Sequence, residues 1–446
     1  MNVSLSEDVF LIIHMKRSKY NYIVPYKPNV FVFFNGISRR FFLVNEVQKN
    51  FFKSILANFD ESKISSSVLK DLLSNGFIVD DHIDEYVLIH TRYQQSISFP
   101  KYDLMIFPTY QCNFDCWYCV QKHTEEHLTK DIIEKIKKHI VRYCVENNIK
   151  SLDLSWFGGE PLLHFDYIQE ISSFARDFCQ ERQIKYSSSM TTNGFLITSE
   201  MLIEMKRLNF VSFQITIDGD KKLHDQTRNQ NGVPSFEKIL TNICSILTHL
   251  PEAYVTLRFN YTPQSIISSI IVEDVNSVIP FDLRNKINVL PRRVWQIDEK
   301  DIDQKEINNI KQSFRNSGYN LLEIDLTNSF KSCYADDIHY NTIFQNGSVD
   351  KCGNIDLDNA HGFLDEDGNI QWKNEILSLS RNIFNTPADC KKCKYLPLCM
   401  GPCLVKRERQ LEKNTTKLSC CIPNKQIYFK QLILDFCEHQ IFSVSK

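Results

Sequence analysis

Apolar and polar residues alternate with two different periods between residues 102 and 293, and the pattern predicts an α/β sheet. Six short apolar runs predict strands: LMIFP, SLDLSWF, KYSSSMTT, VSFQITID, YVTLRFNY and KINVL. Stretches with helical periodicity lie between or after them, at residues 129–147, 165–182, 198–208, 235–250, 265–278 and 301–317. Six βα units in a row predict a parallel sheet, open or curved into a partial (β/α)6 TIM-like barrel, with working groups at the carboxyl ends of the strands.

Residues 20–81 follow a different pattern, which predicts a small winged-helix-like α+β domain. The runs YNYIV, FVFFNG and RRFFLV predict strands, and NEVQKNFFKSIL and SSSVLKDLLSN predict helices before a last strand, FIVDD. Two roles are open for such a domain. It is either a structural cap or a peptide-binding module in which an exposed hairpin edge near FVFFNG accepts an additional strand.

The regular alternation ends near Ile324. Beyond it, Gly and Asp turns multiply and the density of cysteines rises, which marks a third part of the chain. A chain of 446 residues is also too long for one ordinary core. We therefore predict three domains, at residues 1–95, 96–324 and 325–446.

Composition and charge exclude some classes of function. The hydrophobic content of 43% and charged content of 24% are those of a globular protein, and the net charge of −2 gives no reason to expect nucleic acid or a membrane surface as a partner. The N-terminal segment MNVSLSEDVFLIIHMKR has acidic residues before a short apolar run, the reverse of a secretory signal. The sequence therefore predicts a cytoplasmic protein.

Fifteen cysteines are too many for a reducing compartment to hold as disulfides. Cys144, Cys179, Cys244 and Cys437 stand alone and receive no role. The first three lie in amphipathic helical stretches, where a small buried thiol is the simplest explanation. The other eleven fall into two groups, near residues 112–119 and across residues 333–421. Each of the two groups predicts a metal-binding site.

The first group, Cys112, Cys116 and Cys119, has the spacing C-x3-C-x2-C and follows the first predicted strand. A structural zinc site needs four ligands, and His123 or His127 would have to supply the fourth. An incomplete ligand set at the working end of a sheet instead suits a 4Fe-4S cluster with one iron left open for a ligand. We favour the open cluster.

The stretch CNFDCWYC, followed by GGEP, TTNG and ITIDG at the ends of later strands, resembles the signature of the radical S-adenosylmethionine (SAM) superfamily. The resemblance implies that the open iron binds the amino and carboxylate groups of SAM, and that reduction then releases methionine and a 5′-deoxyadenosyl radical. It also implies cofactor contacts. These are Tyr118 behind the adenine, Gly158, Gly159 and Glu160 at the ammonium, Thr192, Asn193 and Asp218 near the ribose, and Arg228 at the carboxylate.

The second group of cysteines resembles the SPASM extension of radical SAM enzymes that modify peptides. Taken alone, PADCKKCKYLPLCMGPC could also be a zinc knuckle. The resemblance implies two auxiliary 4Fe-4S clusters, so that three clusters are expected in all. The distal cluster would use Cys390, Cys393, Cys399 and one of Cys420 or Cys421, and the nearer one would use Cys333, Cys352 and Cys403.

Two departures from the sulfatase-maturing branch bear on the reaction. This chain lacks one upstream cysteine for the nearer cluster, so that cluster either keeps an open iron or takes one of the adjacent Cys420 and Cys421. An open iron could hold a substrate thiolate, which suits thioether formation. Gly353 also stands where that branch has an aspartate that serves as a base, which disfavours formylglycine formation.

The resemblance implies an enzyme, a SAM-dependent maturase of a ribosomally made precursor peptide whose leader binds residues 1–95. The expected product is a thioether crosslink between a cysteine sulfur and a carbon. Carbon–carbon or carbon–oxygen crosslinking remains open, as do side-chain oxidation of a folded target and a non-catalytic metal-binding module. Expected partners are the precursor and a reductant such as flavodoxin or ferredoxin.

Overall fold

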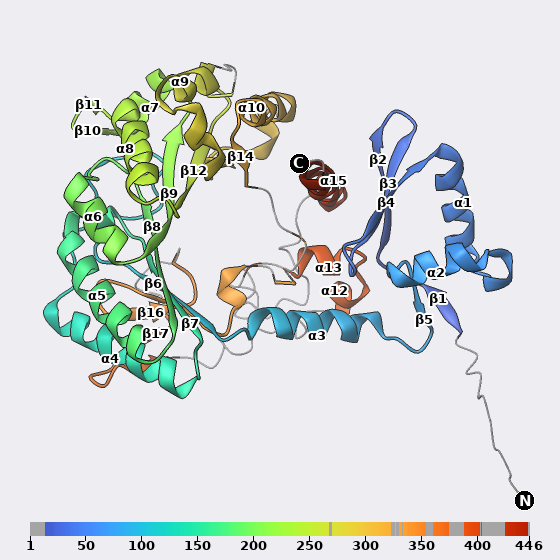
Figure 1. The fold of residues 1–446 in the computed structure, drawn as a ribbon, viewed down its shortest axis with the longest axis horizontal. Helices are drawn as coiled ribbons and strands as arrows, with labels where there is room; N and C mark the ends of the chain where they lie inside the picture. The colour runs from blue at the N-terminus through green and yellow to red at the C-terminus, as the bar shows by residue number, and fades with distance from the viewer. Residues whose placement is uncertain are drawn as a thin grey trace, which may run out of the picture. The chain divides into compact units, whose positions relative to one another are not determined.

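The computed structural model describes residues 14–266, 270–322, 326, 330–331, 333–353, 360–373, 388–401, 403 and 424–444 (Figure 1). The chain divides into two compact units. The sheet unit consists of Phe99–Glu323 and Asp337–Leu377, and the terminal unit consists of Met1–Ser98, Ile324–Asp336 and Ser378–Lys446. Both ends of the chain thus contribute to one unit. The three functional domains expected from the sequence remain a prediction.

The sheet unit confirms the six predicted βα strands, which pair in parallel in the order β13-β12-β9-β8-β7-β6. Strand β14 continues the parallel sheet beside β13, and β15 continues it beside β6. An antiparallel extension, β16-β17-β18, follows β15. The bounds are β6 Lys101–Ile106, β7 Ser151–Trp156, β8 Lys185–Thr192, β9 Phe210–Asp218, β12 Tyr254–Tyr261, β13 Ile287–Arg293, β14 Asn320–Leu321, β15 Tyr340–Ile343, β16 Ser348–Asp350, β17 Gly362–Leu364 and β18 Ile370–Trp372.

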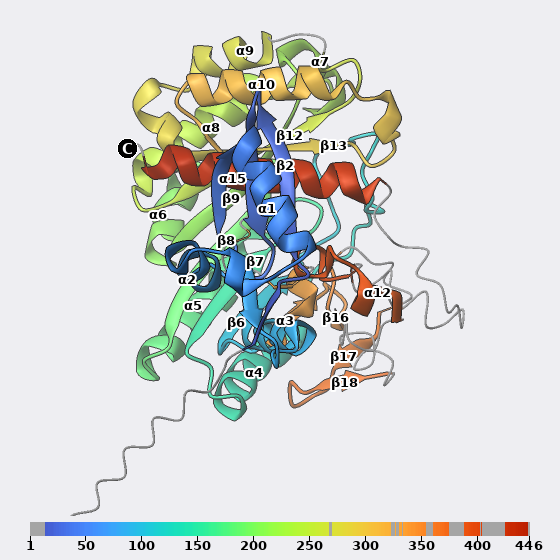
Figure 2. The same ribbon diagram turned by 90° about the vertical axis from the view of Figure 1, so that its right-hand side faces the viewer.

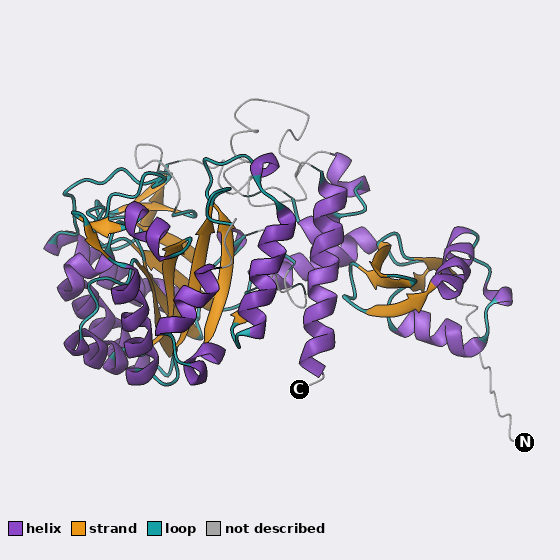
Figure 3. Cartoon of the chain, turned by 90° about the horizontal axis from the view of Figure 1, so that it is seen from above, coloured by secondary structure: helices purple, strands orange, loops and turns teal. Residues whose placement is uncertain are grey.

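Helices cover the outer face of this sheet (Figure 3). They are α4 Lys130–Glu146, α5 Phe165–Glu181, α6 Ser199–Arg207, α7 Lys221–Thr227, α8 Phe236–His249, α9 Ile270–Val278 and α10 Gln304–Asn316. Thr129 caps α4 as expected, since its side chain accepts a hydrogen bond from Ile132 N. Alternate strand residues such as Val255, Leu257 and Phe259 are buried against the helices, so the residues between them face the inner side of the sheet.

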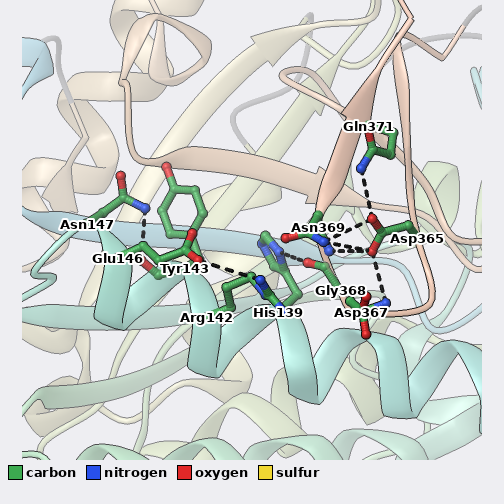
Figure 4. Close-up of polar contacts among 10 residues, drawn as sticks. All are labelled: His139, Arg142, Tyr143, Glu146, Asn147, Asp365, Asp367, Gly368, Asn369 and Gln371. Atoms are coloured by element: carbon green, nitrogen blue, oxygen red, sulfur yellow. Dashed lines mark hydrogen bonds and ion pairs between the residues drawn. The ribbon is translucent and has the colours of Figure 1, made fainter.

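A buried histidine joins α4 to the turn between β17 and β18 (Figure 4). His139 Nδ1 lies 2.8 Å from the carbonyl oxygen of Gly368, and His139 Nε2 lies 2.6 Å from the Tyr102 hydroxyl. Because a carbonyl oxygen can only accept, Nδ1 carries the proton and Tyr102 donates to Nε2. Asp365 closes the same turn by accepting from two backbone N–H groups. The histidine is therefore held neutral between two partners.

Acid is expected to destabilise the sheet unit through His139. Burial lowers the pKa of His139 from 6.5 to about 4. Between these two pH values the unfolded chain binds a proton that the folded chain does not. The contribution of neutral His139 to the free energy of unfolding is therefore complete above the unfolded pKa, and it falls by about 3 kcal/mol as the pH drops to the folded pKa. Urea midpoints across this range check it. As the pH falls from the unfolded to the folded pKa, the urea midpoint of the wild type should decrease more than that of His139→Gln. The control His249→Gln, at an exposed position, should behave like the wild type. An equal decrease in the midpoints of all three proteins would contradict the assignment.

The terminal unit contains the expected three-stranded antiparallel sheet, β2 Asn21–Lys27, β3 Val30–Asn35 and β4 Phe41–Asn45, in that order. Strand β1 Met15–Arg17 pairs with β5 Ile78–Asp80, and the helices are α1 Glu46–Ala57, α2 Ser66–Ser74 and α3 Glu85–Ile97. One expectation needs correction. The run FVFFN lies in β3, which is paired on both sides, so an additional strand would have to pair with β2 or β4 instead.

The C-terminal segments of the terminal unit pack on the face of the three-stranded sheet that lies opposite α1. They form α12 Ala388–Lys392, α13 Leu396–Cys399 and α15 Lys425–Val444, and α15 crosses the strands β2 and β3 (Figure 2). Tyr22 stacks on Tyr395, and its hydroxyl donates to the carbonyl oxygen of Lys394. Phe34 contacts Phe436 edge to face. The N-terminal sheet and the segment that carries Cys390, Cys393 and Cys399 therefore share one core.

Candidate active site at the strand ends

The loop that carries the first three cysteines leaves the end of β6 and is tied back on itself. Tyr110 N donates to Glu126 O, Leu128 N donates to the carbonyl oxygen of Pro108, and the Thr109 hydroxyl donates to Glu126 O at 2.7 Å. Phe114 is buried and meets Phe195 edge to face. The loop is thereby fixed at both its base and its middle.

The three thiols have different environments. Cys112 and Cys116 are partly buried, whereas Cys119 is exposed. Burial raises the pKa of Cys112 to about 12. Arg228 Nη1 lies 3.5 Å from Cys116 Sγ, and His123 Nε2 lies 3.5 Å from Cys119 Sγ. Over the part of the chain that the structure describes, no three His, Cys, Asp or Glu side chains are arranged as a metal site. The thiols share one loop without forming a closed ligand set.

The GGEP loop after β7 lies directly against the backbone of the cysteine loop. Gly159 N donates to Thr109 O, and Glu160 N donates to Gln111 O at 2.7 Å. A Cβ atom on Gly158 would lie 2.4 Å from Thr109 O, and one on Gly159 would lie 2.0 Å from Gln111 O. Only glycine permits this approach, because any side chain would have to displace the neighbouring backbone.

Glu160 connects the loops that follow β7 and β8. Its side chain is fully buried. Oε1 accepts from the Thr192 hydroxyl at 2.7 Å and from Leu162 N at 3.1 Å, and Oε2 accepts from Asn193 N at 2.7 Å. Burial raises the pKa of this carboxyl group, against the effect of these hydrogen bonds. A carboxylate can accept about four hydrogen bonds, so Oε2 retains capacity for one more donor.

Asp218, at the end of β9, joins the cysteine loop to the segment that follows β9. The Tyr118 hydroxyl donates to Asp218 Oδ2 at 2.6 Å, and Arg228 Nη1 donates to the Tyr118 oxygen at 3.0 Å. Burial raises the pKa of Asp218. The structure therefore brings Tyr118, Asp218 and Arg228 together with Cys116, as the sequence led us to expect of neighbouring strand ends.

Several residues near these groups were not singled out from the sequence. Asn193 Nδ2 donates to Asn113 Oδ1, and Gln296 Nε2 donates to the backbone oxygen of Tyr118. Asn260 lies opposite Asp218 in the register of β12 and β9, and Arg258 Nε donates to Asn260 Oδ1. The alternation of Thr256, Arg258 and Asn260 with apolar core residues was the signal that could have identified the last two.

The donor set fits a SAM molecule beside an iron–sulfur cluster. Three buried polar atoms here have no hydrogen-bond partner among the described residues: Asn113 Nδ2, Arg228 Nε and Asp218 Oδ1. Buried polar groups left without partners cost free energy unless a ligand or water satisfies them. Two donors and one acceptor beside a glycine cradle suit a ligand with both a carboxylate and an ammonium group.

The second group of cysteines is divided between the two units. Cys352 lies in the sheet unit, where its N–H donates to Asp350 Oδ1, and the terminal unit holds Cys333, Cys390, Cys393, Cys399 and Cys403. Cys420 and Cys421 lie outside the described residues. A Cβ atom on Gly353 would lie 3.0 Å from Met105 Sδ. The auxiliary-cluster ligands remain a prediction.

Comparisons with known proteins agree with this geometry. Residues 106–254 match the Radical SAM superfamily. A cysteine-type anaerobic sulfatase-maturating enzyme of Clostridium novyi is 23% identical over 352 residues, which are 72% of this chain and 92% of the relative. The radical SAM cyclopropyl synthase TigE of Paramaledivibacter caminithermalis is 24% identical over 386 residues, 77% of each chain.

A solved structure has the same fold. It is anSMEcpe with bound AdoMet and Cp18Cys peptide, which is 19% identical to this chain, with a TM-score of 0.55 over 77% of this chain and 99% of that one. No helix within the described residues is long and apolar enough to cross a membrane.

Proposed function

We propose that this chain, whose residues 106–254 form a radical SAM domain, is an enzyme that crosslinks a ribosomally made precursor peptide. One observation carries the proposal. The loops after four parallel strands converge, with Glu160 bonded to Thr192 and Asn193, and Asp218 bonded to Tyr118 beside Cys116 and Arg228. Loops that converge at strand ends form the active sites of sheets of this kind.

The residues of this site have separate tasks. Cys112, Cys116 and Cys119 would hold a 4Fe-4S cluster, which together with bound SAM supplies a 5′-deoxyadenosyl radical. Glu160 Oε2 would accept from the ammonium group of SAM. Arg228 would pair with its carboxylate, and Asp218 Oδ1 would accept from a ribose hydroxyl. Tyr118 would keep Asp218 and Arg228 in place through its two hydrogen bonds.

The bond formed is proposed to be a thioether. Two auxiliary clusters in the SPASM region, the nearer one with an iron open to a substrate thiolate, would bring a sulfur atom to the carbon that loses hydrogen. A carbon–carbon crosslink is the second candidate, because the relative TigE is named a cyclopropyl synthase. Electrons would come from a flavodoxin or a ferredoxin.

The product of the reaction tests the proposal. A short cysteine-bearing reading frame is first sought beside the gene, and the full chain, reconstituted anaerobically, is then incubated with SAM, a reductant and the peptide that this frame encodes. We expect the peptide to lose two hydrogen atoms and, for a thioether, one cysteine that iodoacetamide can label. Loss of two hydrogens with all thiols retained would favour the carbon–carbon crosslink. SAM cleavage without any change in peptide mass would contradict peptide crosslinking.

The leader of the precursor is proposed to pair with β4. Val47 and Phe51 lie one turn apart on α1, which packs against β4, and their side chains are 78% and 45% exposed. Exposed apolar residues beside an open strand edge suit a peptide that adds a strand and inserts side chains. Because residues 1–95 share a core with the C-terminal segments, their deletion would disturb the fold, and point changes are the sharper test.

Replacing Val47 and Phe51 by lysine is expected to weaken precursor binding by about tenfold or more, since two apolar contacts are lost. Fluorescence anisotropy of a labelled precursor measures the affinity. Val145→Lys, at an exposed position of α4, is the matched control. SAM cleavage without peptide should not change in any of these variants. An unchanged affinity for the precursor would contradict leader binding at this surface.

A further inference from the structure

Arg258 lies in the middle of β12 and faces the side of the sheet where the candidate active site lies. Its neighbours Leu257 and Phe259 are buried against the outer helices. The alternation of a strand therefore directs Arg258 to the inner side, where Asn260 stands opposite Asp218 of the next strand. The guanidinium group is thus placed beside the residues that form the SAM site.

The guanidinium group of Arg258 is only partly used by the protein. Its Nε donates to Asn260 Oδ1 at 2.8 Å, and no described residue accepts a hydrogen bond from its Nη atoms. The side chain is half-buried. Burial, followed by the nearby charge of Arg292, lowers the pKa of Arg258. A cation is thus retained in a place where the surrounding protein disfavours its charge.

The charges around Arg258 do not balance. The positive charges of Arg292 and Arg228 both act on Arg258, and Asp218 is the nearby carboxylate that opposes them. Asp218 already accepts from Tyr118, which Arg228 also contacts. Glu160, the buried carboxylate of the GGEP loop, receives its donors from the loops after β7 and β8. The inner side of β12 and β13 therefore has positive charge to spare, which suits an anionic ligand.

We propose that Arg258 binds a carboxylate of the peptide substrate and so selects the residue that is presented to the radical. This inference rests on the proposed function. Arginine suits the task because its planar fork can donate two parallel hydrogen bonds to a carboxylate. The carboxylate belongs either to an Asp or Glu side chain or to the C-terminus of the peptide. Arg228, which already contacts Cys116, takes the carboxylate of SAM.

The experiment compares weak binding of three defined peptides by saturation-transfer NMR. The peptides are acetyl-Ala-Ala-Glu-Ala-Ala-amide, the same peptide with Gln in place of Glu, and the Gln peptide with a free C-terminus. The proteins are the full chain with its cluster and SAM, the variants Arg258→Gln and Arg258→Lys, and the control Arg142→Gln, which removes a distant surface charge from α4. SAM affinity and SAM cleavage without peptide are measured in parallel.

We expect the wild type and Arg142→Gln to bind one of the two carboxylate peptides about fivefold or more tightly than the neutral peptide. Preference for the Glu peptide identifies a side-chain carboxylate, and preference for the free acid identifies the C-terminus. Arg258→Gln should lose the preference, and Arg258→Lys should keep part of it. SAM affinity should stay within about twofold in both variants.

Two results would overturn the inference. The first is a wild type that cleaves SAM but does not distinguish the three peptides. The second is an Arg258→Gln variant that loses SAM affinity and keeps the preference for carboxylate, because Arg258 would then bind the cofactor. Failure of the wild type to cleave SAM at all would instead contradict the proposed function, so the two failures can be told apart.

Discussion

Replacing Cys116 by alanine is expected to abolish SAM cleavage. Cys116 Sγ lies 3.5 Å from Arg228 Nη1, and the loss of this thiol leaves two cysteines in the loop. Two thiolates cannot hold three irons of a 4Fe-4S cluster. We expect the rate of 5′-deoxyadenosine formation to fall by about three orders of magnitude or more. Chromatography of the nucleoside measures the rate.

Cys144→Ala is the matched control for this variant. Cys144 is buried on α4 among apolar residues and lies outside both groups of proposed ligands. Its replacement should cost about 1 kcal/mol of stability at most and leave SAM cleavage unchanged. If Cys116→Ala cleaved SAM as fast as Cys144→Ala, the assignment of the cysteine loop would be wrong.

Gly159→Ala is expected to have the second-largest effect. The new Cβ atom would lie 2.0 Å from Gln111 O and 2.6 Å from Tyr110 O, so the GGEP loop and the cysteine loop must move apart. That movement breaks the hydrogen bonds of Gly159 N and Glu160 N and displaces the Glu160 carboxylate. Overpacking of this kind costs roughly 2–3 kcal/mol. Because this cost falls on the arrangement of the two loops that binds SAM, we expect about a 100-fold loss of SAM affinity. Isothermal titration calorimetry measures that affinity.

Gly232→Ala serves as the control for the glycine variant. Gly232 has a positive φ, of 83°, which Gly159 does not have, and a Cβ atom there would meet nothing within 4 Å. Its replacement therefore carries the backbone strain of about 1 kcal/mol without the steric clash. Equal SAM affinities in the two variants would show that the close approach of the two loops does not support cofactor binding.

The sequence predicted the sheet and the strand-end loops well, because both follow from local patterns. Strands such as β12 alternate apolar and polar residues, and Thr129 is an ordinary helix cap. The convergence of Glu160, Thr192 and Asn193 followed from the parallel order of the strands, since the carboxyl ends of neighbouring parallel strands meet at one edge.

Other features depend on contacts between distant segments, which no local pattern contains. The run FVFFN became a central strand because RRFFLV pairs with its second edge. The packing of Tyr22 on Tyr395 joins residues 373 positions apart in the chain and groups both ends of the protein into one unit. The alternation in β12 could have placed Arg258 on the inner side of the sheet, but the charges around it come from other strands and loops, which no local pattern contains.

SAM cleavage by the wild-type chain is the decisive measurement for a cluster held by the cysteine loop. The full chain is reconstituted anaerobically with iron and sulfide, all three cysteines of the loop intact, and is then mixed with SAM and dithionite. We expect a brown protein with labile sulfide that releases 5′-deoxyadenosine and methionine in equal amounts. A colourless protein that holds zinc, contains no labile sulfide and leaves SAM intact would contradict this expectation.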